Sequence, residues 1–109
     1  MSPTSRTLKL MRDLGFYAQV VERTIPYKFI KVDLYNWIDI VGVHPTGQGV
    51  LGVQVTSGSN LSARLKKAKD NPALIAWLLC GGKLQAHGWR KLKGRWSADV
   101  RDITMEHLT

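Results

Sequence analysis

Residues 36–43 are Asn36-Trp37-Ile38-Asp39-Ile40-Val41-Gly42-Val43, and residues 50–56 are Val50-Leu51-Gly52-Val53-Gln54-Val55-Thr56. These two stretches decide the fold, because both are rich in the β-branched and aromatic residues that favour strands. The segment between them, residues 44–49, contains one proline and two glycines and is typical of a turn. The pattern predicts a β-hairpin at the centre of a sheet.

The residues before this hairpin predict one helix and one strand. Apolar residues repeat at helical spacing from Leu8 to Leu14, with Pro3 suited to a first helical position and Gly15 to a C-terminal cap, so we expect a helix over residues 3–14. Residues 17–23 are β-prone and predict a strand. Residues 24–33 include the Ile25-Pro26 break and are expected to form an irregular connection.

The residues after the hairpin predict a broken helix and two further strands. Ser59 or Asn60 can cap a helix that runs to Ala68, and Asn71-Pro72 starts a second helical piece that ends at Gly81-Gly82. Residues 83–90 and 95–101 alternate as two strands around a basic turn. With no linker or repeat in its 109 residues, the chain is expected to be a single compact α/β domain, residues 1–109, with a central mixed β-sheet flanked by helices.

The composition indicates a globular protein with a polyanionic partner. Hydrophobic residues make up 44% and charged residues 22%, and the formal net charge is +8. So basic a small domain points to nucleic acid, although a merely soluble basic surface is the alternative. No membrane partner is expected, because no long amphipathic basic helix stands out.

The single cysteine and the N-terminus indicate a cytoplasmic protein. Cys80 leaves no disulfide framework and no cysteine zinc cage, and its apolar neighbours predict that it is buried. The first residues lack the apolar stretch of a secretory signal, and no run approaches the roughly 20 apolar residues that span a bilayer.

Each central strand carries a polar residue where burial is expected. A buried Asp39 would need a hydrogen bond, an opposite charge or a metal ion, and two-residue alternation places Gln54 and Thr56 on one side of their strand. If the strands are neighbours, Asp39, Gln54 and Thr56 converge near the start of the following helix. The alternative is that Asp39 and Gln54 simply face solvent.

The segments 37–42 and 53–56, in this order of elements, resemble the PD-(D/E)xK, or restriction-endonuclease-like, nuclease superfamily, and most of all its branch of Holliday-junction resolvases and VRR-NUC domains. The resemblance implies a Mg²⁺- or Mn²⁺-dependent endonuclease that acts on nucleic acid, with DNA favoured over RNA, and it is compatible with a homodimer. It makes Asp39 the principal metal ligand and Gln54 the second, with Thr56 as the residue that holds water or phosphate. Glu22, at the end of the first predicted strand, could replace a lost charge as a third ligand.

Two departures from the family pattern weaken catalysis. Gln54 stands where the family has an acid, so it brings no charge to a metal, and Thr56 stands where the family has a lysine. Lys66 or Lys67 could supply the missing charge, or both could be a solvated helix face. Asp33 is a weaker site candidate, because it precedes Leu34-Tyr35 and could simply begin a turn or a cap.

Two regions are candidate nucleic-acid contacts. Backbone N–H groups at a helix start can hold a phosphate, and a basic turn with tryptophans can hold backbone and bases. The candidate residues are Ser57, Ser59, Asn60, Arg64, Lys66, Lys67, Arg90, Lys91, Lys93 and Arg95. Trp89 and Trp96 are expected to be buried in the core, with stacking on bases as the alternative.

The sequence contains no motif of several other enzyme classes. The three histidines have no metal-ligand spacing, and the sequence contains no hydrolase triad motif, zinc-protease motif or phosphate-binding glycine loop. The open functions are a metal-dependent DNA nuclease, a degenerate module of the same fold that binds DNA or RNA without cutting, and a protein-interaction domain.

Overall fold

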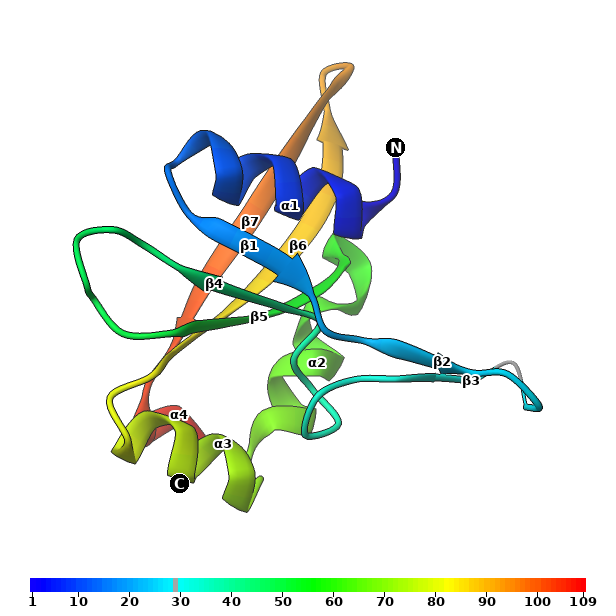
Figure 1. Ribbon diagram of the computed structural model, residues 1–109. Coiled ribbons are helices and arrows are strands. Elements are labelled where there is room, and N and C mark those ends of the chain that lie inside the picture. Colours follow the sequence, from blue (N-terminus) through cyan, green and yellow to red (C-terminus); the bar gives the residue numbers. More distant parts are fainter. Residues whose placement is uncertain (29) are drawn as a thin grey trace.

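A five-stranded mixed sheet organises the protein, and a separate two-stranded sheet extends from it (Figure 1). The structure is a computed structural model that describes residues 1–28 and 30–109. Its elements are α1 (Pro3–Asp13), β1 (Tyr17–Val20), β2 (Arg23–Ile25), β3 (Ile30–Val32), β4 (Ile40–Val43), β5 (Leu51–Ser57), the 3-10 turn η1 (Gly58–Asn60), α2 (Leu61–Ala68), α3 (Pro72–Leu79), β6 (Lys83–Leu92), β7 (Arg95–Ile103) and α4 (Met105–Leu108).

The large sheet has the order β1-β4-β5-β6-β7. β1 with β4, β4 with β5, and β6 with β7 are antiparallel, whereas β5 and β6 are parallel and are joined by the crossover through α2 and α3. The predicted central hairpin is therefore confirmed. Its first strand is shorter than expected, because Tyr35 and Asn36 adopt φ values of 54° and 61° and turn the chain before Trp37.

The segment expected to be irregular forms the small sheet, so that prediction was wrong. β2 and β3 pair antiparallel, with Arg23 opposite Val32 and Ile25 opposite Ile30. The strand expected over residues 17–23 accordingly ends at Val20, and Arg23 begins the next strand. We call residues 23–32 the β2–β3 arm.

Helices cover both faces of the large sheet, as expected. One buried cluster lies under α1 and consists of Met11, Ala18, Ile40, Leu51 and Val53. The larger one lies under α2, α3 and α4 and consists of Trp37, Ile38, Leu61, Ala68, Leu74, Leu84, Ala86, Ile103 and Leu108. Because both faces are covered, the side chains of Asp39 and Gln54 are only 5% and 1% exposed, and the solvent-facing alternative was wrong.

The N-terminal ends of α1 and α3 agree with the sequence, whereas that of α2 does not. Ser2 accepts a hydrogen bond from the backbone of Ser5 before Pro3, and Asn71 caps α3 through its side chain before Pro72. Asn60 stands at the N-cap position of α2, but no side chain caps this helix, because η1 continues directly into α2. The predicted side-chain cap from Ser59 or Asn60 was therefore wrong.

Cys80 is exposed, contrary to the prediction that its apolar run buries it. It lies just past the end of α3, a helix in which only Leu74 is fully buried. In residues 1–28 and 30–109, no helix is both long and apolar enough to cross a membrane.

A buried hydrogen-bond chain ties α1 to β6 and β7. Trp89 Nε1 donates to Thr7 Oγ1 (2.8 Å), and Thr7 Oγ1 lies 3.2 Å from His87 Nδ1. His87 Nε2 lies 3.0 Å from Gln85 Oε1, while Gln85 Nε2 donates to Asp102. Since Gln85 Oε1 can only accept, His87 carries its proton on Nε2 and accepts from Thr7 on Nδ1. The chain is satisfied by a neutral imidazole.

Acid is expected to destabilise the protein through His87. Burial lowers the pKa of His87 from 6.5 to about 4, although the charge of Asp102 opposes this. The unfolded chain therefore binds more protons in this window, so the stability contributed by neutral His87 is full above about pH 6.5 and is lost as the pH falls through about 4. The loss amounts to about 3 kcal/mol.

The measurement is the free energy of unfolding in urea at several pH values for the wild type, for His87→Gln, and for Gln48→Ala as an exposed, non-titrating control outside the buried chain. The cost of His87→Gln should shrink as the pH falls from 7 to 4, whereas that of Gln48→Ala should change much less. A pH-independent cost of His87→Gln would contradict the assignment.

Candidate metal centre

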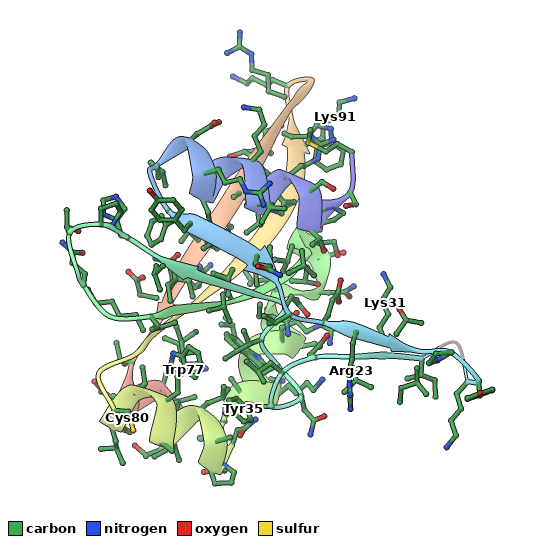
Figure 2. The ribbon with its side chains drawn as sticks, in the orientation of Figure 1. Arg23, Lys31, Tyr35, Trp77, Cys80 and Lys91 are labelled. Atoms are coloured by element: carbon green, nitrogen blue, oxygen red, sulfur yellow. The ribbon has the colours of Figure 1, made fainter. Side chains whose placement is uncertain are left out.

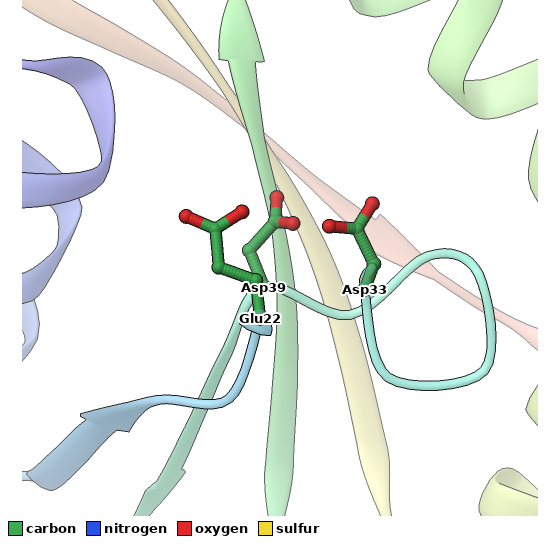
Figure 3. Close-up of side chains that lie close together, drawn as sticks. All are labelled: Glu22, Asp33 and Asp39. Atoms are coloured by element: carbon green, nitrogen blue, oxygen red, sulfur yellow. The ribbon is translucent and has the colours of Figure 1, made fainter. Parts of the chain in front are cut away.

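Three carboxyl groups lie together at one edge of the large sheet. Glu22, Asp33 and Asp39 each offer an oxygen, and these oxygens all lie within 4.8 Å of one another (Figure 3). Glu22 lies between β1 and β2, Asp33 directly after β3, and Asp39 directly before β4. We call these three residues the acidic cluster. Carboxylate oxygens so arranged are the ligands that hard divalent cations prefer.

Asp39 is fixed between two strands by its own backbone. Its N–H donates to the carbonyl of Val53 (2.9 Å), and its carbonyl accepts from the N–H of Val21 (2.8 Å). Its side chain accepts a further hydrogen bond from the N–H of Val55 (2.8 Å). The carboxylate is thereby held against β5, close to the end of that strand at Ser57.

The surroundings of Asp39 disfavour its negative charge. Burial raises the pKa of Asp39 to about 8, and the hydrogen bond and the charge of Asp33 and the charge of Glu22 add to this, while the Val55 N–H opposes it. In residues 1–28 and 30–109, no lysine or arginine forms an ion pair with the acidic cluster, since the pairs there are Lys9–Asp13 and Asp99–Arg101. The cluster therefore favours a proton or a bound cation.

Asp33 is the member of the cluster that the sequence indicated only as a weaker candidate. It does begin a turn, as expected, because its carbonyl accepts from the N–H of Asn36 (3.1 Å). That turn, with Tyr35 and Asn36 in the left-handed region and a bridge between Leu34 and Ile38, brings Asp33 back beside Asp39. The sequence signal was weak: an acid close to a turn, with no regular spacing to Asp39.

Gln54 and Thr56 lie next to Asp39 in the sheet, but their side chains are not part of the acidic cluster. Both are buried on the face of β5 opposite to Val53, toward α2 and α3. The amide nitrogen of Gln54 donates a short hydrogen bond to the carbonyl of Trp37. Gln54 thus holds the backbone that leads into Asp39, and the acids brought to Asp39 from outside its own strand pair are Glu22 and Asp33.

The start of α2 lies close to β6. A side chain at Gly58 would meet Cβ of Arg90 at 3.3 Å, and one at Gly88 would meet Leu61 at 3.1 Å, so the glycines permit this approach. Ser57 and Ser59 are joined by their hydroxyl groups (3.1 Å), and Ser59 and Asn60 are exposed. The polar turn and Arg90 therefore share one surface.

The cations of α2 differ in exposure. Lys66 and Lys67 are exposed, whereas Arg64 is half-buried and its carbonyl accepts from Trp37 Nε1 (2.9 Å). In the described residues neither lysine pairs with an acid of the cluster, so the predicted replacement of the family lysine stays a prediction.

The β6–β7 hairpin presents the second group of cations. Arg90, Lys91, Lys93 and Arg95 are all exposed around a tight turn at Lys93 and Gly94. Trp96 is 47% exposed, so the prediction that it is buried was wrong. The guanidinium of Arg6 lies 4.2 Å from the centroid of the Trp96 ring, a cation–π contact that fixes both side chains at the surface.

An apolar pocket of about 490 Å³ lies apart from the acidic cluster, at the end of the molecule where α3 meets the start of β6. Tyr35, Trp77 and Cys80 are among its lining residues (Figure 2). Its lining contains no carboxylate, so it offers no metal site of the kind described above.

No family model, no curated protein and no solved structure matches this chain.

Proposed function

We propose that this protein is a divalent-metal-dependent nuclease of the restriction-endonuclease-like fold that hydrolyses phosphodiester bonds in DNA. The observation that carries the proposal is the acidic cluster, in which three carboxyl oxygens lie within 4.8 Å of one another in a protein of net charge +8. Such a cluster is unfavourable by itself and becomes favourable with a cation. The net positive charge of the protein suits a polyanionic substrate.

The roles follow from the positions of the residues. Asp39 is the principal ligand because backbone hydrogen bonds fix it, and Glu22 and Asp33 supply the other two carboxylates. Bound there, Mg²⁺ or Mn²⁺ would supply positive charge to a phosphate oxygen and would lower the pKa of water. Gln54 positions Asp39 through the Trp37 carbonyl. Thr56 remains the candidate to hold water or phosphate.

The candidate phosphate contacts lie on the surface that the start of α2 shares with β6. Arg90 packs beside Gly58, and exposed cations continue along the β6–β7 hairpin. A phosphate backbone bound along these cations would neutralise part of the net charge and would release counterions. Binding is therefore expected to weaken steeply as salt rises.

The alternative is a module of the same fold that binds nucleic acid without cutting it. Gln54 and Thr56 favour it, because they stand where the resemblance expects an acid and a lysine. In the part of the chain that the structure describes, no lysine pairs with the acidic cluster. This module would keep salt-dependent binding but would need no metal.

The decisive experiment is incubation of the purified protein with duplex, branched and single-stranded DNA, and with RNA, in Mg²⁺, in Mn²⁺ and in EDTA. Cleavage that needs a divalent metal supports the nuclease. Binding without cleavage in any metal supports the degenerate module. The absence of both would exclude the nucleic-acid function.

A further inference from the structure

The β2–β3 arm stands away from the rest of the protein (Figure 1). Its two short strands pair only with each other, and it is largely exposed in the described residues, with Tyr27 96% and Ile30 51% exposed. An isolated two-stranded hairpin is at best marginally stable in water. A partner that covers the arm would therefore stabilise it.

The arm itself carries positive charge only. Arg23, Lys28 and Lys31 lie within it, and residues 23–32 contain no acid. Arg23 and Lys31 extend from opposite sides of the arm (Figure 2), and the ion pairs of the described chain lie elsewhere. The partner that fits this surface is an anion rather than a basic or apolar surface.

The base of the arm is also the acidic cluster. Glu22 directly precedes β2 and Asp33 directly follows β3, and the pairing of Arg23 with Val32 closes the hairpin beside both carboxylates. A chain bound along the arm would thus lead to the metal ligands. The nearest groups at the base are negative and the arm beyond it is positive, an arrangement that suits a metal-bridged polyanion.

We propose that the β2–β3 arm binds the backbone of a nucleic acid and guides it to the acidic cluster. The inference deepens the proposed function and rests on its nucleic-acid substrate. A second copy of the chain is the competing occupant. Charge argues against it, because two copies of net charge +8 repel each other and their arms are both positive.

The test measures binding of fluorescent single-stranded and duplex DNA by anisotropy in EDTA, so that cleavage does not enter. We compare the wild type with Arg23→Ala/Lys31→Ala and with a control of equal net charge, Lys9→Ala/Lys83→Ala. The control residues are exposed and lie on α1 and at the start of β6, away from the arm. Lys31→Arg tests whether charge rather than shape matters.

We expect the arm variant to bind about 10-fold or more weakly at 0.1 M salt, with a slope of log K against log salt reduced by about 0.9 for each lost phosphate contact. The control and Lys31→Arg should stay within about 2-fold of the wild type. As a second readout, DNA containing 5-iododeoxyuridine should cross-link to Tyr27, and the cross-link should disappear in Tyr27→Ala.

The possible outcomes distinguish a failure of the arm proposal from a failure of the proposed function. Equal affinities for the arm variant, the control and the wild type, with no cross-link within the arm, would overturn the arm proposal and leave the nuclease standing. Loss of DNA binding in the arm variant by a protein that cleaves nothing would support the arm and reject the nuclease. If light scattering detects a dimer and the arm is covered only in that dimer, the arm binds a second copy of the chain and the proposal is overturned.

Discussion

Asp39→Asn is expected to lower metal-dependent cleavage by at least about 100-fold. The substitution keeps the size of the side chain and an oxygen that can accept from the Val55 N–H, but it removes the charge of the principal ligand. The measurement is the single-turnover cleavage rate in Mg²⁺ and in Mn²⁺. The matched control is Asp13→Asn, an exposed carboxylate of α1 that pairs with Lys9. Equal rates for Asp39→Asn and the wild type would remove Asp39 from the site.

The same substitution is expected to stabilise the protein in EDTA at high pH. Because the folded-state pKa of Asp39 is raised from 3.8 to about 8, chiefly by burial, the folded state binds its proton more tightly than the unfolded chain does. That contribution to stability is full below about pH 4 and is lost as the pH rises through about 8. The wild type should therefore lose stability over this range, and Asp39→Asn should lose less.

A divalent metal should stabilise the wild type and leave Asp39→Asn nearly unchanged. At about ten times its dissociation constant, the metal adds about 1.4 kcal/mol to folding, which raises Tm by about 5 °C or more in a domain of this size. The measurement is thermal unfolding at pH 8 with Mg²⁺, Mn²⁺ or EDTA. An equal metal effect on Asp39→Asn would mean that the ion binds elsewhere.

Trp37→Ala is expected to cost about 3–5 kcal/mol of folding stability, enough to unfold much of the protein at 37 °C. Trp37 is completely buried, its indole donates to the Arg64 carbonyl on α2, and its own carbonyl accepts from Gln54. It therefore joins α2 to the segment that leads through Asp39 into β4. The measurement is the urea midpoint together with the unfolding slope.

Two variants separate packing from hydrogen bonding in this effect. Trp37→Phe removes the N–H but keeps an aromatic ring, and should cost about 1–3 kcal/mol from the lost hydrogen bond to the Arg64 carbonyl and the smaller side chain. Trp96→Ala changes a tryptophan that is half exposed on the β6–β7 hairpin and should cost less than about 1 kcal/mol. A Trp37→Ala cost as small as that of Trp96→Ala would contradict the role of Trp37.

The sequence by itself determined the elements whose signals are local. The helix at Pro3, the turn between the central strands, the break at Asn71-Pro72 and the basic turn before Arg95 follow from residue types that act on their own backbone. The apolar residues that flank Asp39 and Gln54, which do not alternate cleanly with polar ones, also indicated correctly that both are buried.

Only the tertiary structure decided which acids meet. Glu22 and Asp33 come together because the β2–β3 arm closes between them, and Asp39 joins them because left-handed residues at Tyr35 and Asn36 turn the chain back to β4. The contact of Trp96 with the Arg6 guanidinium from α1 was likewise decided only by the tertiary structure. Some of these contacts join segments that are far apart in the sequence, and others depend on the backbone angles of single residues. Neither kind leaves a periodic pattern in the sequence. The strands and helices therefore follow from local sequence signals, whereas the candidate metal centre depends on how the β2–β3 arm joins the large sheet.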